Sequence, residues 1–179
     1  GALYSRLRIV RRSREEVQRE RDRSDELLLN ILPEEVANEL KAHGKAEARS
    51  FANTTVLFTD FKGFTAMSES LSAAELVSEI DYCFKGLDAI VERYGVEKIK
   101  TIGDAYMAVA GLPDPQAASA ADIVRAALDM CDFIHARAQE RLASGKPAFE
   151  MRVGLHSGPV IAGIVGVKKF AYDIWGDTV

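Results

Sequence analysis

Apolar positions along the chain follow two different spacings, and the change between them divides the sequence into two parts. Before Gly44, apolar residues recur every three or four positions, which is the period of one stripe along a helix. This stripe consists of Leu3, Leu7, Val10, Val17 and Leu28. Polar residues interrupt it at Arg14, Arg21 and Ser24, so that two interpretations stay open: a solvated single helix, or a parallel dimer contact.

A second short helix is predicted to begin after Leu32. Pro33 suits a first helical turn, Glu34 and Glu35 favour that end of the helix electrostatically, and Gly44 is suited to ending it. A basic cluster, RLRIVRR from Arg6 to Arg12, lies within the first helical segment. It is typical of a segment just inside a membrane in a longer parent protein, and equally of a solvated helix surface.

From about Ser50 the pattern alternates between strand and helix signals. The predicted strands are Thr54–Thr59, Val96–Ile102, Ala105–Ala110, Glu150–His156, Val160–Val165 and Phe170–Trp175, and the predicted helices are Leu71–Tyr94 and Ala117–Leu142. Gly103-Asp104 is a hairpin turn signal, and Gly158 and Gly166 are expected to separate the last three strands. The order predicts an α+β fold, a ferredoxin-like split βαβ with helices packed on a mainly antiparallel sheet.

Composition narrows the function classes. The chain has 179 residues, of which 47% are hydrophobic and 28% charged, and a formal net charge of −4, so its overall charge gives no case for nucleic acid. Cys83 and Cys131 fit no CxxC pattern and are expected to be reduced thiols in helices, consistent with a cytosolic setting. No apolar run is long enough to span a membrane, and charged residues interrupt any secretory signal pattern.

The stretch VLFTDFKGFT, from Val56 to Thr65, carries the first candidate chemistry. Its apolar, β-branched run ends on Asp60, and a glycine turn follows. A second acid, Asp104, lies in the hairpin turn, and a split βαβ core places the first strand beside that hairpin. Each aspartate alone is typical of a turn. Together they favour a cation site, because two neighbouring carboxylates resist ionising together unless a cation separates them.

A hard divalent cation would satisfy such a pair. Mg²⁺ takes oxygen ligands, often one or two carboxylates plus substrate phosphates. Two such ions activate an attacking oxygen and stabilise leaving phosphates. The glycine-containing turn FKGFT, Phe61 to Thr65, offers backbone N–H groups to a polyphosphate. The sequence therefore favours a two-metal site acting on phosphates.

Five stretches in the same order resemble the catalytic domain of class III nucleotidyl cyclases, preceded by that family's helical signalling segment. They are LLLNILPEEVANEL (Leu27–Leu40), VLFTDFKGFT, VEKIKTIGDAYMAVAGLP (Val96–Pro113), MRVGLHSGPVIAGIVG (Met151–Gly166) and YDIWGDTV (Tyr172–Val179). We therefore expect residues 1–44 to be a helical signalling or dimerisation segment and residues 45–179 to be a catalytic domain.

The resemblance implies a reaction: the ribose 3′-hydroxyl attacks the α-phosphate and releases pyrophosphate and a cyclic 3′,5′-monophosphate. It implies that Asp60 and Asp104 are the catalytic, metal-binding aspartates, with the Phe61 carbonyl as a further ligand of two Mg²⁺ or Mn²⁺ ions. Arg152 matches a phosphate-binding arginine. The amides expected to hold the β- and γ-phosphates are those of Phe61, Lys62, Gly63, Phe64 and Thr65.

Base choice depends on Lys100 and Asp173, which match the family's base-reading positions. A donor and an acceptor fit adenine, because lysine can donate to ring N1 and the carboxylate can accept from the N6 amino group. Guanylyl cyclases in this family tend to carry a glutamate and a small polar residue there. The resemblance thus favours ATP over GTP, while a plain salt bridge between the two side chains is the structural alternative.

In this family, each active site forms between two catalytic domains. One chain here carries both residue sets, so the resemblance implies a homodimer with shared sites, in a cytoplasmic domain whose upstream membrane or sensor domain stays open. An asparagine and an arginine of the family pattern would fall just beyond Val179, so we expect these residues alone to be severely impaired and a longer parent to be active. A non-catalytic signalling module stays an alternative. A diguanylate cyclase is disfavoured, because the hairpin reads IGDAY and not GGDEF.

Overall fold

The computed structural model describes residues 2–179, with side chains from Arg8 onward. Its elements are α1 (Ala2–Leu29), α2 (Glu34–His43), β1 (Arg49–Lys62), α3 (Phe64–Ser70), α4 (Ala73–Arg93), β2 (Glu97–Ile102), β3 (Ala105–Ala110), α5 (Ala120–Ala143), β4 (Glu150–Val165) and β5 (Ala171–Trp175). They divide into two compact units. One holds residues 1–46 and 166–171, and the other holds residues 47–165 and 172–179.

The smaller unit contains the two predicted N-terminal helices. Pro33 stands at the N-cap of α2, and Gly44 ends that helix with a φ of 70°, donating its N–H to the Leu40 carbonyl, as the sequence predicts. On α1, Val10 and Val17 are exposed. The side chains of Leu3 and Leu7, which belong to the predicted apolar stripe, lie outside the described residues.

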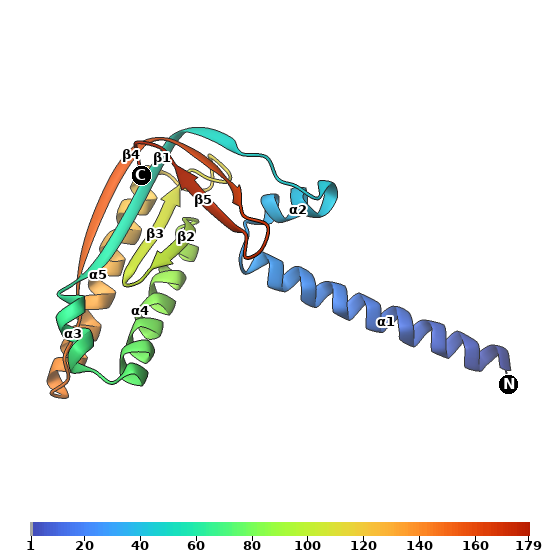
Figure 1. Cartoon of the computed structure of the whole chain (residues 1–179), viewed down its shortest axis with the longest axis horizontal. Helices are drawn as coiled ribbons and strands as arrows, with labels where there is room; N and C mark the ends of the chain where they lie inside the picture. Colours follow the sequence, from blue (N-terminus) through green and yellow to red (C-terminus); the bar gives the residue numbers. More distant parts are fainter. Residues whose placement is uncertain (1) are drawn as a thin grey trace. The chain divides into compact units, whose positions relative to one another are not determined.

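The larger unit is built on one five-stranded sheet with the order β2-β3-β1-β4-β5. The pairs β2–β3, β1–β3 and β1–β4 are all antiparallel. Helices α4 and α5 lie side by side along one face of it (Figure 1). The predicted split βαβ layer of helices on an antiparallel sheet is therefore confirmed.

The core lies between the sheet and these two helices. It includes Leu57, Phe61, Cys83, Leu87, Tyr106, Ile123, Ala126, Met130 and Ile134. Because Leu57 and Phe61 face this core and side chains alternate along a strand, Phe58 and Asp60 lie on the opposite face of the sheet. We call this opposite face the open face.

Each long helix begins at a capping box. Ser72 accepts from the Glu75 N–H at the start of α4, and Ser119 accepts from the Asp122 N–H at the start of α5. The predicted helix Leu71–Tyr94 extends beyond α4 by two residues at its start and one at its end. The predicted start of α5 at Ala117 is three residues too early, because Ser119 holds the cap.

The prediction of a turn at Gly158 is wrong. Residues 150–165 form one continuous strand, β4, which is paired with β1 from Glu150 to Ala162 apart from a register shift between Phe51 and Thr54. The Thr54 hydroxyl donates to the Gly158 carbonyl at 2.7 Å. A Cβ atom on residue 158 would lie 2.5 Å from the Thr178 Oγ1 atom. This glycine thus allows close packing inside a strand and does not end one.

Two sequence expectations about the chain as a whole can be compared with the structure. Cys83 and Cys131 are free thiols in α4 and α5, as expected. Within the described part of the chain, every helix is too short or too polar to span a lipid bilayer.

Candidate active site

Asp60 lies near the end of β1 on the open face, directly opposite Arg152 of β4 in the strand register. The guanidinium grips the carboxylate with two hydrogen bonds. Arg152 Nε donates to Asp60 Oδ1 at 2.8 Å, and Nη2 donates to Oδ2 at 2.6 Å. The pair is well exposed, with relative side-chain accessibilities of 66% for Arg152 and 41% for Asp60.

Asp104 lies in the turn between β2 and β3, next to Gly103 with its φ of 58°. Its Oδ2 atom accepts a hydrogen bond from the backbone N–H of Phe61 at 3.0 Å. Since Phe61 directly follows Asp60, the two acids lie at the same corner of the sheet. Their predicted proximity is therefore confirmed.

Aromatic packing holds this corner in place. The Phe61 ring is buried and stacks on Phe149, with ring centroids 4.5 Å apart, and more distantly on Phe84, at 6.3 Å. Phe149 directly precedes β4, the strand that carries Arg152. The ends of β1 and β4 that bear Asp60 and Arg152 are thus fixed to the core through their neighbours.

Electrostatics at this corner suit a cation. Hydrogen bonding to Asp60, with a smaller contribution from the charge of Asp104, raises the pKa of the Arg152 guanidinium. In the described residues no three His, Cys, Asp or Glu side chains gather as a metal site. Two carboxylates with backbone oxygens are nevertheless a donor set that fits Mg²⁺, which takes its remaining ligands from water or substrate phosphates.

The turn that follows β1 contains the other residues predicted to bind phosphate. Gly63, with a φ of 67°, is the N-cap of α3, and no side chain caps this helix. Phe64 and Thr65 form its first turn. The Lys62 ammonium lies 3.1 Å from the Glu150 carboxylate. The side chain of Lys62 is therefore engaged, while the backbone N–H groups at the start of α3 have no side-chain acceptor.

Lys100 and Asp173, which are 73 residues apart, meet in an ion pair of 2.5 Å. The strand order puts β2 and β5 at opposite edges, so this contact shows that the sheet curls until the edges approach. Lys100 pairs with Met107, and Met107 pairs with Phe58. The Lys100 side chain therefore shares the open face with Phe58 and Asp60.

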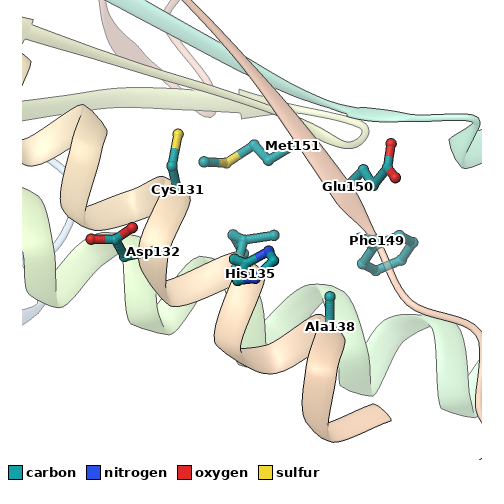
Figure 2. A pocket seen from close by; sticks show the side chains of 8 residues that line it. Cys131, Asp132, His135, Ala138, Phe149, Glu150 and Met151 are labelled. Carbon is teal, nitrogen blue, oxygen red and sulfur yellow. The ribbon is translucent and has the colours of Figure 1, made fainter. Parts of the chain in front are cut away.

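A separate hollow of about 450 Å³ lies on the helix side of the sheet, between α5 and the beginning of β4. Figure 2 shows Cys131, His135 and Met151 around it. Burial and the charge of Asp132 raise the pKa of the Cys131 thiol, which makes it a poor nucleophile at neutral pH. The hollow is therefore a weaker candidate for catalysis than the corner of the sheet that holds Asp60, Asp104 and Arg152, which we call the acidic corner.

Sequence reasoning does not identify the pairing of Arg152 with Asp60. Family resemblance implies only that Arg152 is a phosphate ligand. The missing information is the strand register, because the two residues are 92 positions apart. The signal lies in the pairing of β1 with β4, which aligns an exposed acid with an exposed arginine.

The chain is similar to proteins of one known family. The family model for the adenylate and guanylate cyclase catalytic domain matches residues 46–179. An adenylate cyclase of Mycobacterium tuberculosis is 40% identical over 180 residues, covering 100% of this chain and 40% of that protein. Guanylyl cyclase C of Cavia porcellus is 39% identical over 180 residues, covering 99% of this chain and 16% of that protein.

A solved structure is also similar. The adenylyl cyclase CyaB from P. aeruginosa superposes with a TM-score of 0.70 and 29% sequence identity, over 75% of this chain and 70% of that one. The chain thus spans less than half the length of the two relatives above and most of this solved domain.

Proposed function

Because the chain belongs to the adenylate and guanylate cyclase catalytic domain family, we propose that it converts ATP to 3′,5′-cyclic AMP and pyrophosphate. One observation carries this proposal. The acidic corner of Asp60, Asp104 and Arg152 lies on the same open face of the sheet as the Lys100–Asp173 pair. A triphosphate-binding corner and a base-binding pair thus face the same side.

At the acidic corner, Asp60, Asp104 and the Phe61 carbonyl would hold two Mg²⁺ or Mn²⁺ ions. Bound there, these ions lower the pKa of the attacking ribose hydroxyl and offset charge on the phosphates. The chain's own contribution is to keep the two carboxylates in one place. The hydrogen bond from the Phe61 N–H orients Asp104, and the stacking of Phe61 on Phe149 anchors the end of β1.

The phosphates would bind beside the acids. The amides of Phe61, Lys62, Gly63, Phe64 and Thr65 surround the turn into α3, where no side chain competes for the helix N–H groups. Arg152 would hold a phosphate with its guanidinium, which suits bidentate recognition of such oxygens. The glycine at position 63 allows the left-handed backbone that this turn requires.

The adenine ring would bind at Lys100 and Asp173. The ammonium donates to adenine N1, and the carboxylate accepts from the N6 amino group. Their 2.5 Å contact puts donor and acceptor next to each other before any base is present. Guanine presents the reverse pattern on this edge. It would therefore place a donor opposite the Lys100 ammonium and an acceptor opposite the Asp173 carboxylate. The pair favours ATP over GTP, and a guanylyl cyclase is the alternative.

We propose a symmetric homodimer as the active form. Acidic corner and base-binding pair occur in one chain, so two copies facing each other would form two equivalent sites. Each site would take its acids from one protomer and its base-reading pair from the other. Analytical ultracentrifugation of the active protein tests this arrangement, and an active monomer would contradict it.

The substrate is tested by measuring cyclic product from ATP and from GTP, with Mg²⁺ and with Mn²⁺, on a longer parent protein that includes the asparagine and the arginine expected after Val179. We expect cyclic AMP to predominate with either ion. Preferential cyclic GMP would overturn the adenine assignment, and absence of both products would favour a non-catalytic signalling module. Lys100→Glu should lower turnover of ATP, whereas Lys146→Glu, the same charge change at an exposed site on the turn after α5, should not.

A further inference from the structure

We propose that Arg152 has a second role besides holding phosphate. In the nucleotide-free protein its guanidinium neutralises Asp60 in place of a divalent cation, and binding of cation and triphosphate transfers it from the carboxylate to the phosphates. This inference rests on the proposed function, because it concerns the same corner. It adds that the protein suppresses metal binding until a triphosphate arrives.

The first support is the fit between the two groups. Asp60 and Arg152 are cross-strand neighbours, so the backbone itself places them opposite each other. Both carboxylate oxygens are occupied, at 2.8 and 2.6 Å from the guanidinium nitrogens. A cation that takes Asp60 as a ligand therefore competes with the guanidinium for the same two oxygens.

The second support is the charge balance at the corner. Asp60 and Asp104 bring two negative charges together, and such a pair is unfavourable without a positive charge nearby. Arg152 interacts electrostatically with both acids. The neighbouring ammonium of Lys62 is turned to Glu150, 3.1 Å away. Arg152 therefore supplies the positive charge that a metal ion would otherwise supply.

The third support is that the pair can open at low cost. Both side chains are well exposed, at 66% and 41%, so water can solvate each group when they separate. An exposed ion pair of this kind contributes little stability. Arginine also recognises carboxylate and phosphate oxygens with the same planar fork. The guanidinium can therefore change partner without refolding of either strand.

The exchange predicts a particular order of affinities. A metal ion alone breaks the ion pair and leaves Arg152 without a partner. A metal ion arriving with a triphosphate gives Asp60 a new cation and Arg152 a new anion at the same time. Metal and nucleotide should therefore bind cooperatively, and Arg152 should oppose the first step while favouring the second.

The test is Mn²⁺ binding to the nucleotide-free protein, measured from the electron paramagnetic resonance signal of free Mn²⁺. Arg152→Ala should bind Mn²⁺ about two- to fivefold more tightly than the wild-type protein, the range expected for removal of one exposed ion pair. Lys62→Ala removes the same charge two positions beyond Asp60 and should change the affinity less. Thermal unfolding of both variants confirms that they are folded.

A second measurement adds the triphosphate. With α,β-methylene-ATP present, which cannot be cyclised, Arg152→Ala should bind Mn²⁺ more weakly than the wild-type protein, reversing the order of affinities. Arg152→Lys keeps the charge without the fork and should fall between the two in both measurements. In ¹⁵N spectra, the Nε–H signal of Arg152 should shift when Mg²⁺ and the analogue are added together.

The outcomes separate this inference from the proposed function. If Arg152→Ala leaves Mn²⁺ binding unchanged or weaker without nucleotide, the exchange is wrong while the cyclase proposal stands. Tighter Mn²⁺ binding, together with no cyclic product from the longer parent protein, would support the exchange and contradict the proposed function. If Asp60→Asn does not alter Mn²⁺ binding, the corner holds no cation and both are wrong.

Discussion

Two regions of the larger unit join arginine to carboxylate, and they differ in what surrounds the contact. Between α4 and α5, Glu79 accepts two hydrogen bonds from Arg137, at 2.9 and 2.7 Å, and a third from Arg141 at 2.9 Å. At the open face, Asp60 accepts two from Arg152, at 2.8 and 2.6 Å. The hydrogen-bond geometry of the two regions is nearly the same.

Burial separates them. The Glu79 side chain is 4% exposed and its arginines are 21% and 10% exposed, whereas Asp60 and Arg152 are 41% and 66% exposed. A buried charge that loses its partner cannot be solvated, while an exposed one can. The first cluster therefore fastens two helices together. The second can serve as a site where partners are exchanged.

The largest effect should come from the exposed region. Asp60→Asn removes the charge that a cation needs while keeping the shape of the side chain. We expect cyclic product formation to fall by at least about 10²–10³-fold, the range seen when one electrostatic stabiliser is removed. The free energy of unfolding should hardly change, since the pair is solvated. Product assays and urea denaturation of the same preparation check both expectations.

A mutation in the buried cluster should lower the stability of the protein and leave its activity unchanged. Glu79→Gln leaves Arg141 without its counter-charge and Arg137 with only the exposed Glu140, and we expect the free energy of unfolding to fall by about 2–4 kcal/mol. Arg137 also lies over the Tyr82 ring, 4.1 Å from its centroid, which keeps it from turning to solvent. The molecules that remain folded should keep their activity. Loss of activity without loss of stability would contradict the comparison.

The position of a site residue could be predicted from the sequence only where a local sequence pattern determines it. Asp60 lies near the end of a strand and Asp104 lies in a hairpin turn, so a split βαβ topology is enough to bring them together. The contact of Lys100 with Asp173 depends on the curl of the whole sheet, and no local pattern encodes that. The pairing of Arg152 with Asp60 depends on register, which is set by packing across β1 and β4.

The fold likewise has some features that the local sequence predicts and others that contacts between distant segments determine. The hairpin of β2 and β3 follows from a glycine turn between two short apolar runs. The sequence HSGP indicates a turn, yet β4 continues through it. Thr55 and Ser157 share a hydroxyl hydrogen bond of 2.8 Å, and Gly158 packs closely on Thr178. These contacts join distant segments, and they outweigh the local preference of glycine and proline for a turn.

Glu97 differs from both Glu79 and Asp60, because the surroundings of its carboxyl group disfavour the charged form. Burial raises its pKa from 4.5 to about 7. Since the folded state holds the proton more tightly than the unfolded state, stability from this group is present below pH 4.5 and is lost as the pH rises through 7. At pH 8, Glu97→Gln should therefore raise the free energy of unfolding by about 1–3 kcal/mol.

The pH dependence provides the control for Glu97. At pH 5 the folded wild-type protein carries a neutral carboxyl group there and the unfolded chain is only partly ionised, so the variant and the wild type should differ much less than at pH 8. Urea denaturation at both pH values measures the difference. An equal effect of Glu97→Gln at pH 5 and pH 8 would show that packing, and not ionisation, is responsible.

The smallest effect should come from an ion pair with a short contact distance and two exposed side chains. Lys85 lies 2.6 Å from Asp81 on α4, and the two side chains are 74% and 56% exposed. This distance matches the shorter Asp60–Arg152 contact and is slightly less than the 2.7 Å between Arg137 and Glu79. Lys85→Ala should nevertheless change the free energy of unfolding by no more than about 0.5 kcal/mol. A loss above about 1 kcal/mol would mean that contact distance, rather than burial, determines which ion pairs stabilise this fold.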